Sequence, residues 1–276
     1  MAGVDSRVAD GTLVRLFDRA TNEPTMAVVD GDEWIAVEGT IEELHQHHRA
    51  GASLPTKGRL DKEKIDGPLS PVLPSKIICV GLNYRRHAAE MKKSIPDEPL
   101  LFMKPPSALI GRGDPIELPE QSKEVHHEGE LAIVIGERLR DGDVAAARGA
   151  IFGYTCACDV TARDIQRRES RYTRSKGFDS FAPVGPSIAL APEFEPADHR
   201  LSCRVDDELR QQSRLDDFIF AIDEVIAFIS GVMTLFPGDL IFTGTPSGVG
   251  PIRSGQTVSV EIDGIGRLSN PVRQRP

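Results

Sequence analysis

Two acidic residues open an apolar run in the segment HHEGELAIVIG. Glu128 and Glu130 are two positions apart at the start of an uninterrupted apolar strand, so both side chains should point to the same face. Two carboxylates that share a small space are destabilising unless they are protonated or neutralised by a cation. The pair therefore suggests a metal site, although acidic residues with a period of two are equally typical of the solvated face of an edge strand.

A third carboxylate, Asp159, closes a second apolar strand, IFGYTCACD. A charged residue in this position can simply cap the strand end. Three carboxylates at the ends of apolar strands can also converge as an all-oxygen ligand set, which suits Mg²⁺ or Mn²⁺ and leaves positions open for water or substrate. Cys156 and Cys158 lack the C-x-x-C spacing and a paired histidine, so we expect buried core thiols there and no zinc site.

An imidazole and a carboxylate are three positions apart in GLNYRRHAAEM, where a strand exit leads into a predicted helix. His87 and Glu90 would share one helical face, and a carboxylate beside an imidazole raises its basicity, as a general base requires. An isolated pair of this kind is more often an exposed polar pair. By the same rule we expect His45, His47 and His48 in ELHQHHRA to lie on a solvated helix.

Other polar residues give weaker signals. Lys176 in RSKGFDSFAPVGP follows a basic loop and could be an ordinary surface lysine. The glycine-rich segment FTGTPSGVG could offer backbone amides and the Thr245 hydroxyl to an anion, but it lacks the Gly-Lys-Ser/Thr ending of a P-loop. His126 and His127 precede the acidic pair directly, and we assign neither as a metal ligand.

The elements that must position these residues are mostly strands. Residues from 77 onward form short β-branched runs bounded by glycine and proline, and helical periodicity is convincing chiefly in NYRRHAAEMKK, VAAARGA and FAIDEVIAFISGVM. The pattern predicts an α+β, β-rich fold. Two segments dense in charge, TKGRLDKEKIDG and QRRESRYTRSKG, are expected to lie on loops.

The first 70 residues read as a small separate module of short strands followed by the polar helix TIEELHQHHRA. Its boundary is indicated by GPLSPVLPSKI, where three prolines interrupt any regular element just before the strand IICVG. We therefore predict an N-terminal module over residues 1–70 and a main domain over residues 74–276.

Composition and charge limit the classes of function. A formal net charge of -9 argues against nucleic acid as a partner, because a nucleic-acid footprint needs lysine and arginine on one face. An anionic substrate would then need local positive charge within the site. No stretch reaches transmembrane length, the segment MAGVDSRVADGTLVRLF resembles neither a signal peptide nor an anchor, and the four cysteines are scattered. We expect a cytoplasmic protein with reduced thiols and no membrane partner.

Six segments together resemble the fumarylacetoacetate hydrolase family. They occur in the family's order and cover roughly residues 74 to 272, so the ordered set is far more specific than any single motif. The segments are KIICVGLNYRRHAAEM, FMKPPSALIGRGDPIELP, HHEGELAIVIG, GYTCACDVTARDIQ, TRSKGFDSFAPVGP and LFPGDLIFTGTPSGVG.

The resemblance implies a mixed β-sandwich roll for the second domain, and an often dimeric protein that binds Mg²⁺ or Mn²⁺, so we expect a homodimer. It places His87 and Glu90 at the family's catalytic dyad, on a segment that commonly acts as a lid. Glu128, Glu130 and Asp159 match the family's metal ligands, and Lys176 matches its site lysine. Positions that contact substrate or support the site are matched by Arg163, Gln166 and Thr245.

Two features make the chain similar to the compact bacterial branch of the family. The N-terminal module is short, and Asn83 lies near a point where long members carry an additional metal-site acid. That branch includes acylpyruvate hydrolases, oxaloacetate decarboxylases, and the decarboxylase and isomerase of aromatic-acid catabolism. The substrate implied is a small anionic 2-oxo acid, which chelates the metal while the cation stabilises an enolate.

From this we expect cleavage of a C–C bond in a 2-oxo or β-diketo acid, of the acylpyruvate hydrolase or oxaloacetate decarboxylase type. One alternative is an isomerase or decarboxylase of the 2-hydroxyhepta-2,4-diene-1,7-dioate type. Another, from a different class, is a non-catalytic binding protein that keeps the fold.

Overall fold

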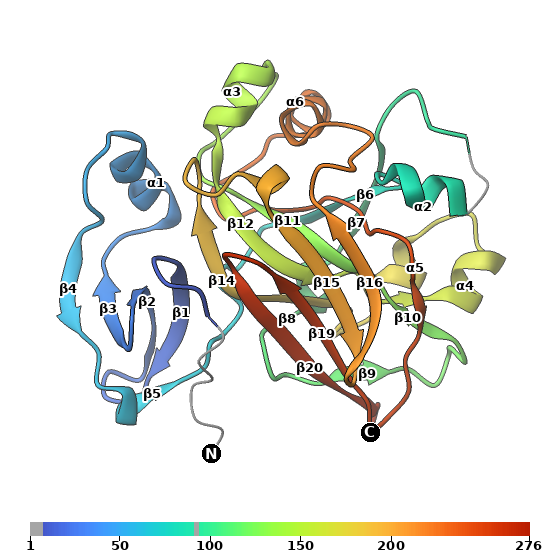
Figure 1. Cartoon of the computed structure of the whole chain (residues 1–276), viewed down its shortest axis with the longest axis horizontal. Helices are drawn as coiled ribbons and strands as arrows, with labels where there is room; N and C mark the ends of the chain where they lie inside the picture. Colours follow the sequence, from blue (N-terminus) through green and yellow to red (C-terminus); the bar gives the residue numbers. More distant parts are fainter. Residues whose placement is uncertain (1–7, 91–93) are drawn as a thin grey trace.

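The computed structural model describes residues 8–90 and 94–276, with the exception of the His87 side chain (Figure 1). The segments with helical periodicity form helices, and two further short helices lie after Asp159. The helices are α1 (Ile41–Arg49), α2 (Arg85–Glu90), α3 (Val144–Gly149), α4 (Arg163–Arg168), α5 (Thr173–Lys176) and α6 (Ile222–Val232), with 3₁₀ turns at Lys62–Lys64, Pro106–Ala108 and Pro196–Asp198.

A large mixed sheet runs through the molecule. Its strands are β1 (Leu13–Asp18), β2 (Glu23–Asp30), β3 (Glu33–Val37), β4 (Thr56–Arg59), β5 (Ile65–Asp66), β6 (Ile77–Gly81), β7 (Leu100–Lys104), β8 (Leu109–Ile110), β11 (Gly129–Ile135), β12 (Ile151–Cys158), β14 (Ala182–Leu190) and β17 (Leu240–Phe242). Over the described residues their order is β4-β3-β2-β1-β14-β12-β11-β17-β6-β7, with β5 paired to β1 and β8 paired to β14. The order places β11 and β12 in the middle of the sheet.

A second sheet packs across the middle of the first, and its strands lie in front of β11 and β12 in Figure 1. Its strands are β9 (Ile116–Leu118), β15 (Arg200–Val205), β16 (Glu208–Arg214), β19 (Thr257–Ile262) and β20 (Gly266–Gln274), in the order β16-β15-β19-β20-β9. A small sheet of β10 (Val125–His127), β13 (Thr161–Ala162) and β18 (Gly250–Pro251) lies beside them in the order β13-β10-β18. The two large layers form the predicted sandwich-like roll.

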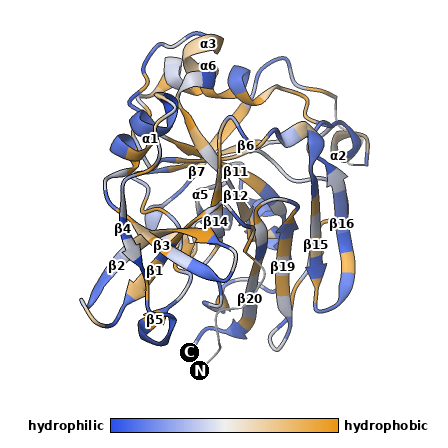
Figure 2. Cartoon of the chain, turned by 60° about the vertical axis from the view of Figure 1, so that its left-hand side comes forward, coloured by the Kyte–Doolittle hydropathy of each residue, from blue (hydrophilic) through white to orange (hydrophobic). Residues whose placement is uncertain are grey.

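Strand β11 is buried on both of its faces, which explains why its sequence is apolar without alternation. Leu131 and Ile133 belong to the core between the two sheets, whereas Ala132 and Val134 belong to a second core on the opposite face. Figure 2 shows the hydrophobic colour concentrated on these central strands, while the outer strands alternate. A strand buried in this way holds the residues that precede it in a fixed orientation.

The N-terminal strands have their own core around Trp34 and Leu16, and they lie to one side of the molecule in Figure 1. Their sheet is nevertheless continuous with the rest, since β1 pairs with β14 through Leu13 and Ile188. The division into a module of residues 1–70 and a domain of residues 74–276 stays a prediction.

His45, in the N-terminal module, was expected to be solvated, and the structure shows that it is buried. It is 1% exposed, and its Nε2 atom lies 3.0 Å from the carbonyl oxygen of Gly149. The ring lies so close to Gly136 that a Cβ atom there would be 2.4 Å from it. Helix α1 therefore docks on the second domain through this histidine, whereas His47 on the same helix is exposed.

Two further expectations were wrong. The segment QRRESRYTRSKG is not a loop: it contains the end of α4 and the whole of α5. The segment TKGRLDKEKIDG contains β4 and β5. In the described part of the chain, no helix is both long and apolar enough to cross a membrane.

Candidate active site

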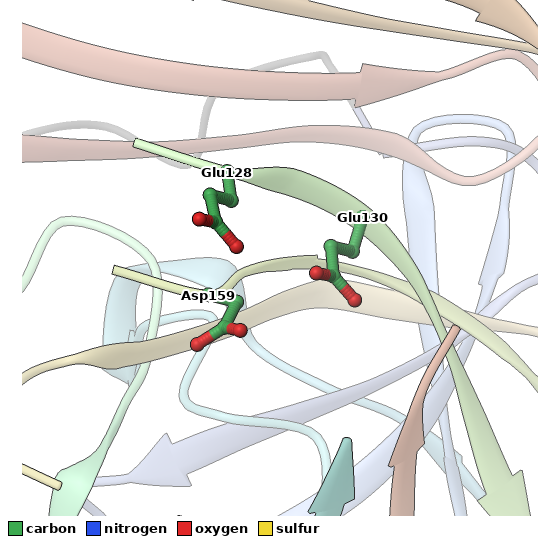
Figure 3. A group of neighbouring side chains, drawn as sticks. All are labelled: Glu128, Glu130 and Asp159. Atoms are coloured by element: carbon green, nitrogen blue, oxygen red, sulfur yellow. The ribbon is translucent and has the colours of Figure 1, made fainter. Parts of the chain in front are cut away.

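The three predicted carboxylates meet where β11 begins and β12 ends (Figure 3). Antiparallel pairing places Glu130 opposite Ala157, and the backbone N–H of Asp159 donates to the carbonyl of Glu128 at 2.8 Å. The residues Glu128, Glu130 and Asp159 are 7%, 2% and 1% exposed. One oxygen of each lies within 4.8 Å of an oxygen of the others. The solvated-face alternative is therefore wrong.

Three cationic side chains surround these carboxylates. The Nζ atom of Lys176, at the end of α5, lies 2.8 Å from Oε2 of Glu128 and 2.5 Å from Oδ2 of Asp159. Arg163, the first residue of α4, forms an ion pair with Oε1 of Glu128. Lys104, the last residue of β7, is fully buried, and its Nζ lies 2.5 Å from Oδ1 of Asp159. The cluster therefore combines three acidic with three basic side chains.

These contacts set the charge of the site. Although burial opposes ionisation, Lys176 and Arg163 lower the pKa of Glu128 to about 2. In the same way, Asp159 and Glu128 raise the pKa of Lys176 above its usual range even though burial opposes its charge. At neutral pH this pair is therefore charged on both sides.

Glu130 is in a different position. Its Oε2 accepts a hydrogen bond of 2.7 Å from the backbone N–H of Gly244, but none of the three cations forms an ion pair with it. Burial, followed by the charges of Asp159 and Glu128, raises the pKa of Glu130 well above its usual range. Among the three carboxylates, Glu130 therefore has the most to gain from an added cation.

A cavity of about 670 Å³ opens onto the carboxylates. Its volume is in the range of about 300–1,000 Å³ that is typical of small-molecule sites. Apolar side chains of Phe102, Leu100 and Tyr172 line one part of it, and Arg163 and Arg167 line another. A second cavity of about 230 Å³ beside Arg214 contains none of the predicted site residues.

All three of the predicted substrate contacts line this cavity beside the carboxylates. Arg163 donates through Nη1 to Oε1 of Gln166 at 2.6 Å, while its other terminal nitrogen contacts Glu128. Gln166 therefore fixes the direction of a guanidinium group that faces both a carboxylate and the cavity. Thr245, from the segment after β17, also lines the cavity, and its Oγ1 donates to the carbonyl of Gly129 at 2.8 Å.

Comparison with known proteins identifies the family of the chain. Residues 76–273 match the model of the fumarylacetoacetate (FAA) hydrolase C-terminal family. The chain belongs to the fumarylacetoacetate hydrolase family. Protein Rv2993c of Mycobacterium tuberculosis is 51% identical over 206 residues, which cover 74% of this chain and 77% of the relative.

Two similar solved structures share the fold over 96% of this chain. The 5-carboxymethyl-2-hydroxymuconate delta-isomerase from Mycobacterium smegmatis is 38% identical, with a TM-score of 0.85 and 100% of that chain covered. The maleylpyruvate hydrolase from Sphingobium sp. SYK-6, in complex with manganese(II) and pyruvate, is 32% identical, with a TM-score of 0.77 and 100% of that chain covered. The chain is thus a family enzyme with a β-rich α+β fold.

The predicted catalytic dyad of this family member is described only in part. Glu90, the last residue of α2, lines the cavity. His87 belongs to the same helix, but its side chain lies outside the described groups. The pairing of His87 with Glu90 stays a prediction.

The donor set fits a hard divalent cation. Carboxylate oxygens are the ligands that Mg²⁺ and Mn²⁺ prefer, and three of them from Glu128, Glu130 and Asp159 gather in a buried space. The like-charge interaction that raises the pKa of Glu130 is the kind that a cation relieves. All four cysteines are buried free thiols, as predicted for Cys156 and Cys158.

Sequence reasoning missed two residues of this site. Lys104 ends the apolar strand LLFMK, and Asp159 directly follows the apolar strand β12. A charged residue at the end of an apolar strand could therefore have identified Lys104 as a site residue. Gln211 lies in the polar run ELRQQSR of β16, where nothing distinguishes it from Gln212, yet it is buried behind the carboxylates. Of the two histidines left unassigned, His126 lines the cavity, whereas His127 is buried and bonded to Gln211.

Proposed function

We propose that this protein is a divalent-metal-dependent enzyme that cleaves a C–C bond in a small 2-oxo or β-diketo acid. The observation that carries the proposal is the cluster of Glu128, Glu130 and Asp159, whose ligand oxygens lie within 4.8 Å of one another beside a cavity of about 670 Å³. A buried carboxylate cluster beside a cavity of substrate size is the arrangement that metal-assisted chemistry requires.

Glu128, Glu130 and Asp159 would hold Mg²⁺ or Mn²⁺, and the ion would polarise the 2-oxo oxygen and stabilise the negative charge of an enolate. The name of the maleylpyruvate hydrolase structure, which contains manganese(II) and pyruvate, supports this choice of ion and of substrate class.

The cations of the chain itself would bind and orient the acid. Lys176 carries its charge at neutral pH and lines the cavity, so its ammonium group can donate hydrogen bonds to an anionic substrate. Arg163, held in place by Gln166, offers a second positive group on the other side of Glu128. These groups supply the local positive charge that a chain of net charge -9 must provide for an anion.

His87 and Glu90 would complete the chemistry. For hydrolysis, the imidazole would take a proton from the attacking water, and the carboxylate of Glu90 would raise the basicity of the ring. Glu90 lies at the cavity, which supports this role. The small anionic substrate, the homodimer and the cytoplasmic location stay predictions.

A second candidate is isomerisation of a hydroxydienedioate, favoured by the name of the similar Mycobacterium smegmatis structure. It needs the same site, because the enolate then takes up a proton at another carbon and no water attacks. The two candidates differ in the leaving group and not in the metal ligands.

Parallel turnover assays test the proposal. Acetylpyruvate, oxaloacetate and a hydroxydienedioate are followed with Mg²⁺ or Mn²⁺ and with EDTA, using wild type, Glu130→Gln and the control Glu208→Gln on an exposed position. We expect metal-dependent loss of an oxo acid in wild type and Glu208→Gln, and no turnover in Glu130→Gln. Full activity in Glu130→Gln would overturn the metal assignment, and turnover of the dienedioate alone would select the second candidate.

A further inference from the structure

Gln211 connects the second sheet to the active site through its side-chain amide. It lies on β16 and is 1% exposed, although its side chain is polar. The amide makes contacts with two backbone groups and two side chains that belong to other segments. These are Gly129 N at 2.9 Å, His127 Nδ1 at 3.2 Å, Thr245 Oγ1 at 2.7 Å and Pro246 O at 2.7 Å.

The orientation of this amide follows from its backbone partners. The N–H of Gly129 can only donate, so the group that faces it must be the amide oxygen Oε1. The carbonyl of Pro246 can only accept, so the group that faces it must be Nε2. Both backbone contacts give the same assignment, and the second N–H of the amide then points to Thr245 Oγ1.

This assignment also fixes two neighbouring protons. Thr245 Oγ1 accepts from Gln211, so its own hydroxyl proton is directed to the carbonyl of Gly129 at 2.8 Å. The Thr245 hydroxyl therefore links Gln211 on β16 to Gly129 on β11, and its proton is not available to a ligand. His127 must carry its proton on Nδ1 to donate to Oε1 of Gln211.

The segment that Gln211 holds is also the segment that contacts a predicted metal ligand. Gly244, next to Thr245, donates its N–H to Oε2 of Glu130 at 2.7 Å. On the other side, Thr243 bonds to β11 through Leu131, and its carbonyl accepts from Nδ2 of Asn83 at 2.9 Å. Residues 243–246 are thus fixed at each position, and Gln211 supplies the contacts at Thr245 and Pro246.

Two glycines allow the second sheet to pack closely against its neighbours near Gln211. Gly248 has φ +97°, and a Cβ atom on it would lie 2.1 Å from the carbonyl oxygen of Arg210. A Cβ atom on Gly129 would lie 2.9 Å from Cβ of Cys203 on β15. Glycine at both positions lets the second sheet come within hydrogen-bonding distance of β11 and the 243–246 segment.

We propose that Gln211 is a positioning residue, which fixes residues 244–246 against β11 and thereby sets the orientation of Glu130 for the metal ion. The inference rests on the proposed metal site. Outer partners that orient a ligand affect metal binding even though they do not touch the ion.

The test compares Gln211→Leu with the matched control Gln212→Leu, which changes the exposed neighbour on the same strand. Mn²⁺ affinity is measured by titration calorimetry, beside urea unfolding. We expect Gln211→Leu to weaken Mn²⁺ binding by about 10-fold or more, and Gln212→Leu to bind as wild type does. Thr245→Val is the second variant, because it removes the hydroxyl that accepts from Gln211 and donates to Gly129, and we expect it to weaken Mn²⁺ binding as well.

A double variant, Gln211→Leu with Thr245→Val, shows whether the two residues act together. If Gln211 acts through Thr245, the combined loss of affinity will be smaller than the product of the single losses. Wild-type Mn²⁺ affinity in both single variants, whatever their stability, would overturn the positioning role alone. Absence of Mn²⁺ binding in the wild type would instead overturn the proposed function, and this inference with it.

Discussion

The Nζ atom of Lys176 lies 2.8 Å from Oε2 of Glu128, and both side chains are buried. The two residues are 48 positions apart in the chain: Lys176 ends the short helix α5, and Glu128 lies between β10 and β11. The same ammonium group also contacts Asp159, so one cation connects two of the three predicted metal ligands while facing the cavity. From this position we expect Lys176 to interact with the negative charge that develops on a bound oxo acid.

Replacing Lys176 with Met should reduce kcat by roughly 10²-fold, the usual cost of removing one donor to a developing oxyanion. Lys176→Arg should not restore activity, because a guanidinium group is larger and planar. Steady-state kinetics with the preferred oxo acid measure both variants, and Lys57→Met, on an exposed residue, is the control. Wild-type kcat in Lys176→Met would exclude an electrostatic role for this lysine.

Replacing Lys104 with Met should destabilise the fold. Lys104 is fully buried and pairs with Asp159, so its loss leaves a buried carboxylate with one counter-ion fewer. Removing one partner of a buried pair costs roughly 3 kcal/mol or more of unfolding free energy, which urea denaturation measures. The exposed control Lys57→Met should change the unfolding free energy by less than about 1 kcal/mol. Equal values for the two variants would contradict a structural role for Lys104.

Replacing His87 with Ala should separate metal binding from hydrolysis. The predicted ligands do not include His87, so Mn²⁺ affinity should stay at the wild-type value, whereas hydrolysis should lose roughly 10²-fold or more without its general base. Decarboxylation needs no attacking water, so oxaloacetate turnover should fall less than acetylpyruvate turnover. Equal losses for both substrates would mean that His87 has a role other than activating water.

Acidification should weaken the docking of α1. Burial lowers the pKa of His45 below its usual value, since protonation would add a buried charge, and its Nδ1 atom has no hydrogen-bond partner within the described part of the chain. The unfolded state therefore binds the proton more readily than the folded state does. The contribution of His45 to stability is fully present above the unfolded pKa of about 6.5 and is lost as the pH falls below it.

Urea unfolding between pH 7.5 and pH 5 measures this effect. His45→Gln keeps a donor for the carbonyl of Gly149 but does not titrate, so its unfolding free energy should fall less on acidification than that of the wild type. The control His47→Gln, on the exposed side of α1, should keep the wild-type slope. The idea fails if His45→Gln and His47→Gln have the same slope.

Local sequence patterns were sufficient for several parts of this site. The spacing of Glu128 and Glu130 requires a common face once the segment is a strand, and the apolar runs on either side identify the strand. Asp159 was visible as the charged end of another apolar run. The ordered motifs then indicated the family and its fold, which the matched residues 76–273 confirm.

Local patterns could not show which charged residues are buried. Lys176 lies in a segment dense in charge, and such segments are usually solvated, but tertiary packing folds it into α5 and places its ammonium group against two carboxylates. His45 was misjudged for the same reason, because the polarity of α1 does not reveal that one of its histidines faces the second domain.

The sequence by itself identified the three carboxylates that gather at the site, the family and the β-rich architecture, because these depend on residue types at short spacing. Only the tertiary structure decided which distant residues complete the site. Lys104 is 55 positions from Asp159, and Gln211 is 82 positions from Gly129 and 34 from Thr245. Contacts over such separations depend on how the sheets pair and pack, and that arrangement is not encoded in any local pattern.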